Sequence, residues 1–190
     1  PSKLADPYSE KEKKNAISEY ARMLEVKEKI GHVEIPKINQ DLPIYAGTSE
    51  EVLQKGVGHL EGTSLPVGGK STHTVLTAHR GLPTAKLFTD LNKMKKGDVF
   101  YIHNIKEVLA HKVIDVFVVE PSDFDKVLVV EGKDYCTLLT CTPYMINSHR
   151  LLVRAERTEY NPAAVEKDLV SQVTGKYKIY LIISLIIIAF

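Results

Sequence analysis

The chain has 190 residues, with 25 Lys and Arg against 24 Asp and Glu, which gives a formal net charge of +1. Hydrophobic residues make up 44% of the chain and charged residues 26%, an ordinary globular composition that excludes collagen-like, disordered and disulfide-stapled proteins. The charges nearly cancel and form no long run of one sign, which argues against a basic nucleic-acid-binding surface. Any function must therefore depend on a local site.

The N-terminal part of the chain predicts an extended arm followed by a helix. Ser9 and Glu12 form a capping box, and apolar residues follow at helical spacing, which predicts a helix over residues 9–30. Residues 1–8 precede the cap and contain a proline, so they predict an extended arm. Because the sequence begins with Pro1 rather than Met, we expect any signal peptide or N-terminal anchor to have been removed.

The middle of the chain has the pattern of short strands. Apolar alternation or β-branched runs occur within residues 31–47, and then at 72–78, 99–102, 107–120, 134–141 and 151–156. Short helices are predicted on the connections, one after Thr48 and one over residues 84–96. About eight short strands without alternating helices predict a mainly β fold, a mostly antiparallel barrel or sandwich.

The C-terminal end predicts a helix and then a strongly apolar run. Asn161 followed by proline is typical of a helix start and predicts a helix over residues 161–175. Residues 179–190 contain no charge, but a spanning helix needs about 20 apolar residues. The run is therefore either a buried strand or core helix, or a truncated transmembrane anchor. We favour the start of an anchor over residues 176–190, because no polar positions alternate within the run.

The two cysteines of the chain lie in one predicted strand. Cys136 and Cys141 are five residues apart, which places them on opposite faces and about 16 Å apart along the chain. A disulfide needs Cα atoms within about 7 Å, so the two cannot pair while the strand is extended. Cys136 shares a face with Leu138 and is interpreted as a small buried residue. Cys141 lies at the strand end, where reactive groups are often presented.

A reactive thiol needs a base or cation beside it and a donor for the oxyanion. Among the seven histidines, His79 is favoured because it also ends an apolar strand, and His149 is the alternative because it is close to Cys141 in the sequence. Arg150 and Arg154 flank the last strand, and an arginine beside the thiolate would serve both needs. The chain has no Cys or His spacing typical of a zinc site.

Three motifs together resemble the signature of the sortases. They are the segment TLLTC that ends at Cys141, Arg150 nine residues later, and His79 in TAHRG. The resemblance extends over about residues 31–156 and implies an eight-stranded sortase β-barrel, here the catalytic domain of residues 31–160. One departure is Ala78, where the family pattern has glycine.

Two further features resemble the class C, pilin-polymerising branch of the sortases of Gram-positive bacteria. Asp6, Pro7 and Tyr8 resemble the lid of that class, in which the aspartate meets the catalytic arginine and the aromatic ring covers the cysteine. The apolar C-terminus resembles the second membrane anchor of that class. The resemblance thus implies an autoinhibited enzyme held at the membrane, with its catalytic domain on the extracellular face.

The resemblance implies a cysteine transpeptidase. The Cys141 thiolate would attack the Thr carbonyl of an LPXTG-like sorting signal, His79 would act as acid and then base, and Arg150 would steady substrate and oxyanion. The acceptor would be a lysine amine on another pilin subunit, so pilins are the implied partners. The thioester carries the energy of the cleaved peptide bond, and no cofactor or metal is needed.

Three alternatives remain open at this stage. A cysteine peptidase would hydrolyse the acyl-enzyme with water, and an added amine would not divert its product. A housekeeping sortase would transfer the acyl group to peptidoglycan. A membrane-tethered β-barrel binding module would use Cys141 and His79 only structurally, so that Cys141→Ala would change its stability but no chemistry.

Overall fold

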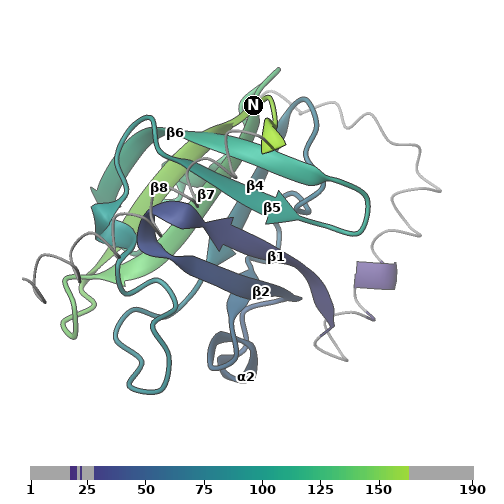
Figure 1. Ribbon diagram of the computed structural model, residues 1–190. Coiled ribbons are helices and arrows are strands. Elements are labelled where there is room, and N and C mark those ends of the chain that lie inside the picture. Colours follow the sequence, from purple (N-terminus) through teal and green to yellow (C-terminus); the bar gives the residue numbers. More distant parts are fainter. Residues whose placement is uncertain (1–17, 21, 23–27, 163–190) are drawn as a thin grey trace, which may run out of the picture. The chain divides into compact units, whose positions relative to one another are not determined.

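The computed structural model describes residues 18–20, 22 and 28–162 (Figure 1). By its internal contacts the chain divides into two units, Pro1–Thr158 and Glu159–Phe190. The strands described below all belong to the first unit.

Several predicted segments lie wholly or mostly outside the described residues: the arm 1–8, the helices 9–30 and 161–175, and the anchor 176–190. Ser18, Glu19, Tyr20 and Arg22 are helical, as predicted. The first strand begins at Lys29, so the last two residues of the predicted N-terminal helix belong to a strand instead. No helix among the described residues has the length and apolar character needed to cross a membrane.

The described residues form a closed barrel of eight strands, which confirms the predicted fold class. The order around the barrel is β1-β2-β3-β4-β7-β8-β6-β5. The strands are β1 (Lys29–Ile35), β2 (Gln40–Ala46), β3 (Val57–His59), β4 (Thr72–Thr77), β5 (Val99–His103), β6 (Val108–Val119), β7 (Asp134–Thr142) and β8 (His149–Thr158). The short helical elements are α2 (Glu50–Leu53), η1 (Pro36–Ile38), η2 (Leu91–Lys93) and η3 (Asp125–Val127).

The barrel is mostly antiparallel, as predicted, but two of its strand pairs are parallel. These are β2 with β3 and β4 with β7. The β4–β7 pair is aligned over six residues, from Thr72 opposite Asp134 to Thr77 opposite Leu139. Parallel neighbours require a crossover connection, and here the chain between the two strands passes through β5 and β6. The two strands therefore end at the same side of the barrel.

The barrel interior is filled by alternate residues of the strands. On β7 and β8 these include Cys136, Leu138, Val153 and Ala155, all fully buried in one hydrophobic cluster. The prediction that Cys136 is a small buried residue is therefore confirmed. Burial raises the pKa of its thiol, with the charge of Asp134 as a smaller cause.

The helix predicted over residues 84–96 is wrong. Only Leu91–Lys93 is helical there, as one turn of 3₁₀ helix, and the remainder is turns and irregular chain. Leu87 has a φ of +37°, which an α-helix does not allow. Leu87, Phe88, Leu91 and Met94 are nevertheless all buried. Their helix-like spacing thus reflects burial of a folded loop against the barrel.

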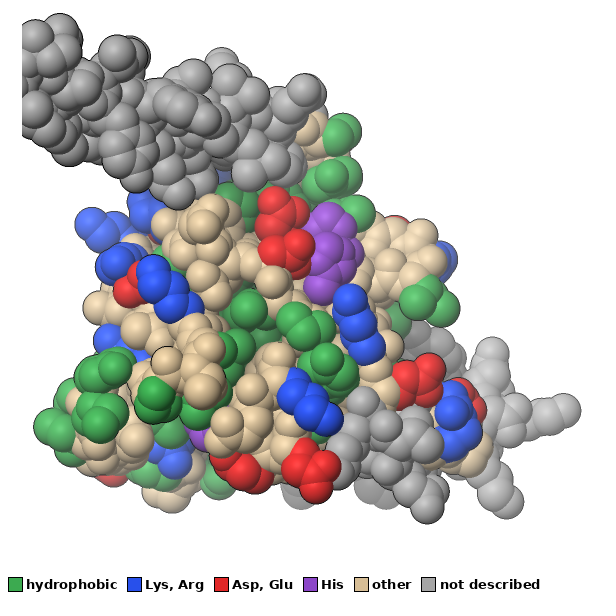
Figure 2. Space-filling model, turned by 60° about the horizontal axis from the view of Figure 1, so that its bottom comes forward, with side chains coloured by type: hydrophobic (Ala, Val, Ile, Leu, Met, Phe, Trp, Pro, Cys, Tyr) green, Lys and Arg blue, Asp and Glu red, His purple; other side chains and the backbone are tan. Residues whose placement is uncertain are grey.

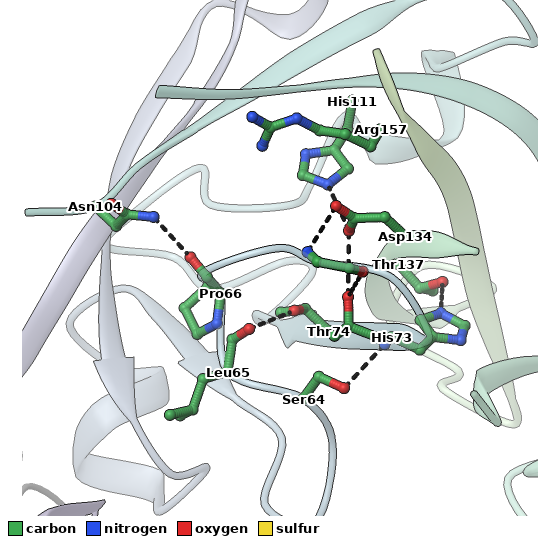
Figure 3. Close-up of polar contacts among 12 residues, drawn as sticks. Ser64, Leu65, Pro66, His73, Thr74, Asn104, His111, Asp134, Thr137 and Arg157 are labelled. Carbon is green, nitrogen blue, oxygen red and sulfur yellow. Dashed lines mark hydrogen bonds and ion pairs between the residues drawn. The ribbon is translucent and has the colours of Figure 1, made fainter. Parts of the chain in front are cut away.

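The loop between β3 and β4 is fixed to the starts of β4 and β7 by polar contacts (Figure 3). Asp134, the first residue of β7, accepts a hydrogen bond at Oδ2 from the Gly69 amide, at 2.8 Å. Its Oδ1 accepts a longer one from Thr72 Oγ1, at 3.3 Å, and the same hydroxyl lies 2.7 Å from the Gly69 carbonyl. One carboxylate thus ties the two parallel strands and the loop together at the end where both strands begin.

Further hydrogen bonds hold the same loop along its length. The Thr74 hydroxyl donates to the Leu65 carbonyl at 3.0 Å, and the Asn104 amide donates to the Pro66 carbonyl at 3.1 Å. The Ser64 hydroxyl accepts from the His73 amide at 2.9 Å. The loop is therefore attached both to β4 and to the residue that follows β5.

His111 of β6 is buried beside this polar cluster. Its Nε2 lies 4.0 Å from Asp134 Oδ1, its ring stacks on Phe100, and its Nδ1 has no hydrogen-bond partner among the described residues. Burial, reinforced by the positive charge of Arg157, lowers the pKa of His111 to about 3. The ring is therefore neutral at neutral pH.

This burial makes the fold sensitive to acid. A histidine in the unfolded chain has a pKa of about 6.5. Between pH 6.5 and about 3 the unfolded state therefore binds more protons than the folded state, and the free energy of unfolding decreases as the pH is lowered. Between pH 7 and 5.5 we expect His111 to cost about 1 kcal/mol of unfolding free energy. In His111→Gln that part of the loss should disappear, as measured by urea unfolding at both pH values. His149→Gln, at a more exposed histidine, is the control and should retain the loss. Equal losses in the wild type and His111→Gln would contradict the assignment.

Candidate active site

The pairing of β7 with β8 places Cys141 and Arg150 side by side. The two residues are directly opposite each other in the antiparallel register. Directly opposite side chains project from the same face of a sheet, with Cβ atoms about 4.5–5.5 Å apart. Both residues are partly exposed, and Cys141 lies on the face opposite to that of buried Cys136. The two side chains therefore project side by side from one face of the sheet, and the thiol has access to solvent.

The pairing of β4 with β7 brings His79 to the same end of the barrel. Beyond the last register pair, the Ala78 amide donates to the Leu139 carbonyl at 3.3 Å, and the Thr140 hydroxyl donates to the Ala78 carbonyl at 2.8 Å. Continuing the register by two residues from Thr77 and Leu139 aligns His79 with Cys141. The structure thus brings all three favoured residues to one end of the barrel.

Side-chain contacts continue this alignment past the strand ends. Arg80 Nη1 donates to Thr142 Oγ1 at 2.9 Å, and Arg80 Nε donates to the Thr89 carbonyl at 3.1 Å. One residue further, Gly81 packs against the ring of Tyr144, where an added Cβ would lie only 2.8 Å from ring carbon Cε2. The φ of +92° at this position also favours glycine. The chain after His79 is therefore held against the chain after Cys141.

Arg150 is itself held by the loop that precedes it. Its Nη1 donates to the carbonyl oxygens of Asn147, at 3.1 Å, and His149, at 3.0 Å. In the described part of the chain both bonds use this one nitrogen of the five-donor guanidinium. The side chain is thus oriented by the loop that precedes β8.

The two alternative site residues lie elsewhere. His149 is opposite Thr142, so by strand alternation it projects from the other face than Cys141, and its Nε2 lies 3.1 Å from Glu120 Oε1. Arg154 donates to Asp115 at 3.0 Å and lies over the ring of Phe117. Neither residue is adjacent to the thiol, which leaves His79 and Arg150 as its neighbours.

One further residue at this site, Glu50, was not predicted from the sequence. Its Oε1 lies 3.3 Å from Nε2 of His79, and Gln54 Nε2 donates to the same oxygen at 2.6 Å. The bond from Gln54, and to a smaller degree the contact with His79, lower the pKa of Glu50 below its ordinary value. Glu50 is 29 residues before His79, and a helix start rich in acidic residues is common, so no sequence pattern identifies this contact.

The side chains next to the thiol on this face of the sheet are apolar and only partly accessible: Leu152 is buried, and Leu139 and Phe117 are partly exposed. On the same face as Cys141 and Arg150, the next row across the strands consists of Leu139, Leu152 and Phe117. Figure 2 turns the side of the molecule that carries α2 toward the reader, and hydrophobic side chains gather in its middle with charged ones around them. In the described ranges no group of three or more His, Cys, Asp or Glu side chains is arranged to hold a metal ion.

The chain belongs to the sortase family. The family model of the sortase domain matches residues 33–158, which is the barrel. Sortase A of Bacillus anthracis is 33% identical over 135 residues, which cover 70% of this chain and 61% of that protein. Sortase D of Bacillus subtilis is 30% identical over 114 residues, covering 60% of this chain and 54% of that protein. This chain therefore spans less than two thirds of the length of these relatives.

Solved structures of class C sortases are more similar. Sortase C1 of Streptococcus suis matches with a TM-score of 0.81 and 63% identity, over 86% of this chain and 92% of that chain. Sortase C1 of Streptococcus agalactiae matches with a TM-score of 0.79 and 64% identity, over 82% of each chain. Sortase C of Streptococcus pneumoniae matches with a TM-score of 0.71 and 62% identity, over 84% of this chain and 80% of that chain. The predicted resemblance to class C sortases is therefore confirmed.

The different surroundings of the two cysteines predict selective alkylation. Iodoacetamide should modify Cys141 of the folded protein and leave Cys136 unmodified, because Cys136 is fully buried and burial raises the pKa of its thiol. Peptide mass mapping locates the label, and both cysteines should react after unfolding in urea. Labelling of Cys136 in the folded protein would contradict the placement of β7.

Proposed function

We propose that this chain is a cysteine transpeptidase that joins pilin subunits. In this proposal Cys141 is the nucleophile, His79 is the acid and base, and Arg150 donates hydrogen bonds to the oxyanion and the substrate. The observation that supports it most is the meeting of these three residues at one barrel end, since β7 pairs with both β4 and β8. Membership of the sortase family makes this the appropriate chemistry to test.

In the proposed first step, the Cys141 sulfur attacks the Thr carbonyl carbon of an LPXTG-like sorting signal. The peptide bond to the following Gly breaks, His79 protonates the departing amine, and a thioester remains on Cys141. Arg150 donates to the carbonyl oxygen as negative charge develops on it. The partly exposed Leu139 and Phe117 of the row beside the thiol are suited to the leucine and proline side chains of such a signal.

In the proposed second step, a lysine ε-amine of another pilin attacks the thioester. His79 accepts the proton of the amine, an isopeptide bond forms, and the Cys141 thiolate is released. The pilin acceptor is supported by the similarity to class C sortases, of which the Streptococcus pneumoniae protein is described in terms of pilin substrate specificity. A sortase that anchors proteins to peptidoglycan would share the first step and differ in this one.

The proposal includes two segments that lie outside the described residues. Asp6, Pro7 and Tyr8 would form a lid over the site, and residues 176–190 would begin a membrane anchor that keeps the barrel at the extracellular face of a Gram-positive cell. Both parts depend on the likeness of these segments to class C features.

The main test is product analysis by mass spectrometry. An LPXTG peptide and a lysine-bearing pilin fragment are incubated with the wild type, Cys141→Ala and Arg150→Met. We expect an isopeptide-linked product that requires Cys141, and a rate about 10²–10³-fold lower in Arg150→Met, as for loss of an oxyanion donor.

Other products would support the alternatives. Hydrolysed peptide alone, even with excess amine, would indicate a cysteine peptidase. Transfer to a peptidoglycan amine but not to the pilin lysine would indicate a housekeeping sortase. Absence of a Cys141-dependent product even from the lid-opened form Asp6→Ala/Tyr8→Ala would indicate a binding module.

The lid predicts a gain of activity. In Asp6→Ala/Tyr8→Ala the initial rate of thioester formation should rise, because the variant lacks the contacts that close the lid over the site. A partly exposed Asp–Arg pair stabilises the closed lid by only about 0–1 kcal/mol, so we expect a modest increase. The matched control is Asp41→Asn, an exposed aspartate on β2. Equal rates for the wild type and the double variant would exclude gating by these residues.

A further inference from the structure

Glu50 approaches His79 from an element that is separate from both strands of the site. It is the first residue of α2, and this helix is fixed because Val52 is buried and the amides of Val52 and Leu53 both donate to the Ser49 carbonyl at 3.0 Å. The Glu50 side chain is 67% exposed, and that of His79 is 32% exposed. A fixed backbone thus presents a carboxylate at the outer edge of the imidazole.

We propose that Glu50 is a positioning residue for His79, one that accepts a hydrogen bond from Nε2–H and so leaves Nδ1 as the ring nitrogen that exchanges the proton. This inference rests on the proposed function. The supporting geometry is the 3.3 Å contact between Oε1 and Nε2, together with the bond from Gln54 that holds the same oxygen at 2.6 Å.

The contact has two physical consequences. A neutral imidazole has one donor and one acceptor nitrogen, so an acceptor placed at Nε2 selects the tautomer and the ring orientation. A negative charge beside the ring also stabilises the imidazolium and disfavours a nearby thiolate. Because the pair is exposed, the electrostatic effect is moderate and decreases at high ionic strength.

Other ionisable groups also surround His79, and the test must separate Glu50 from them. Cys141 aligns with His79 at the end of β7, and Arg150 lies opposite Cys141 on β8. Arg80 follows His79 in the chain, and Tyr144 packs on Gly81, the residue after Arg80. These groups remain in place in a Glu50 variant. A change on neutralising Glu50 alone therefore reports the carboxylate.

The experiment is a pH profile of kcat and KM for transpeptidation at low ionic strength. Glu50→Gln keeps the shape of the side chain but removes the charge, so we expect both limbs of the profile to move to lower pH. We also expect kcat to fall about threefold or more at the alkaline limb, with KM unchanged. Glu50→Asp keeps the charge and should keep the position of the profile while recovering part of kcat.

The matched control is Glu51→Gln, which makes the same change of charge one residue further along α2. It should leave the profile and kcat at wild-type values. An equal shift in Glu51→Gln would show a general field effect and overturn the assignment, as would an unchanged profile in Glu50→Gln.

A second measurement does not need activity. In Cys141→Ala, the NMR titration curve of the His79 ring, assigned by its loss in His79→Ala, should move to lower pH when Glu50→Gln is added. If the wild type forms no transpeptidation product but this shift is observed, the proposed function fails and the Glu50 contact stands. If the curve does not move, the contact fails whatever the activity.

Discussion

The parallel pairing of β4 with β7 is the interaction on which the site depends. Six aligned residue pairs set the register of the two strands, and the same register, continued past the strand ends, aligns His79 with Cys141. If the register of the two strands slipped by one residue, His79 would no longer align with Cys141, and the two side chains would project from opposite faces of the sheet. Asp134 secures the register at the opposite end, because it binds both the loop before β4 and the first residue of that strand. The polar cluster in Figure 3 thus serves the site although it lies at the far end of the strands.

The second pairing of β7, with β8, places Arg150 opposite Cys141. The same alternation that buries Cys136 in the core turns Cys141 outward, where Arg150 is its direct neighbour. Cys136 and Cys141 therefore differ in exposure for a geometric reason: they are five positions, an odd number, apart along one strand. Arg80 and Gly81 then hold the two loops together beyond the strands.

Much of this could be predicted from the sequence, because strand alternation, turn residues and the ends of apolar runs are local signals. The strands, the burial of Cys136 and the motifs around Cys141 and His79 are all of that kind. The parallel pairings are not local, and no helical crossover marked them. The error at residues 84–96 arose because Leu87 and its buried neighbours have helix-like spacing while the backbone turns at a positive φ. Glu50 was missed because its contact with His79 exists only once α2 is packed.

The long chain separation of the site residues also bears on how the protein folds. Arg80 and Thr142 are 62 residues apart in the chain, and β5 and β6 lie between β4 and β7 in the sequence although β4 and β7 are neighbours in the barrel, so this contact forms only once β4 and β7 have paired. Until then Cys141 has no histidine aligned with it. Under the proposed function, a chain in which β4 and β7 have not yet paired would therefore lack the assembled site, and acylation would have to wait for the fold.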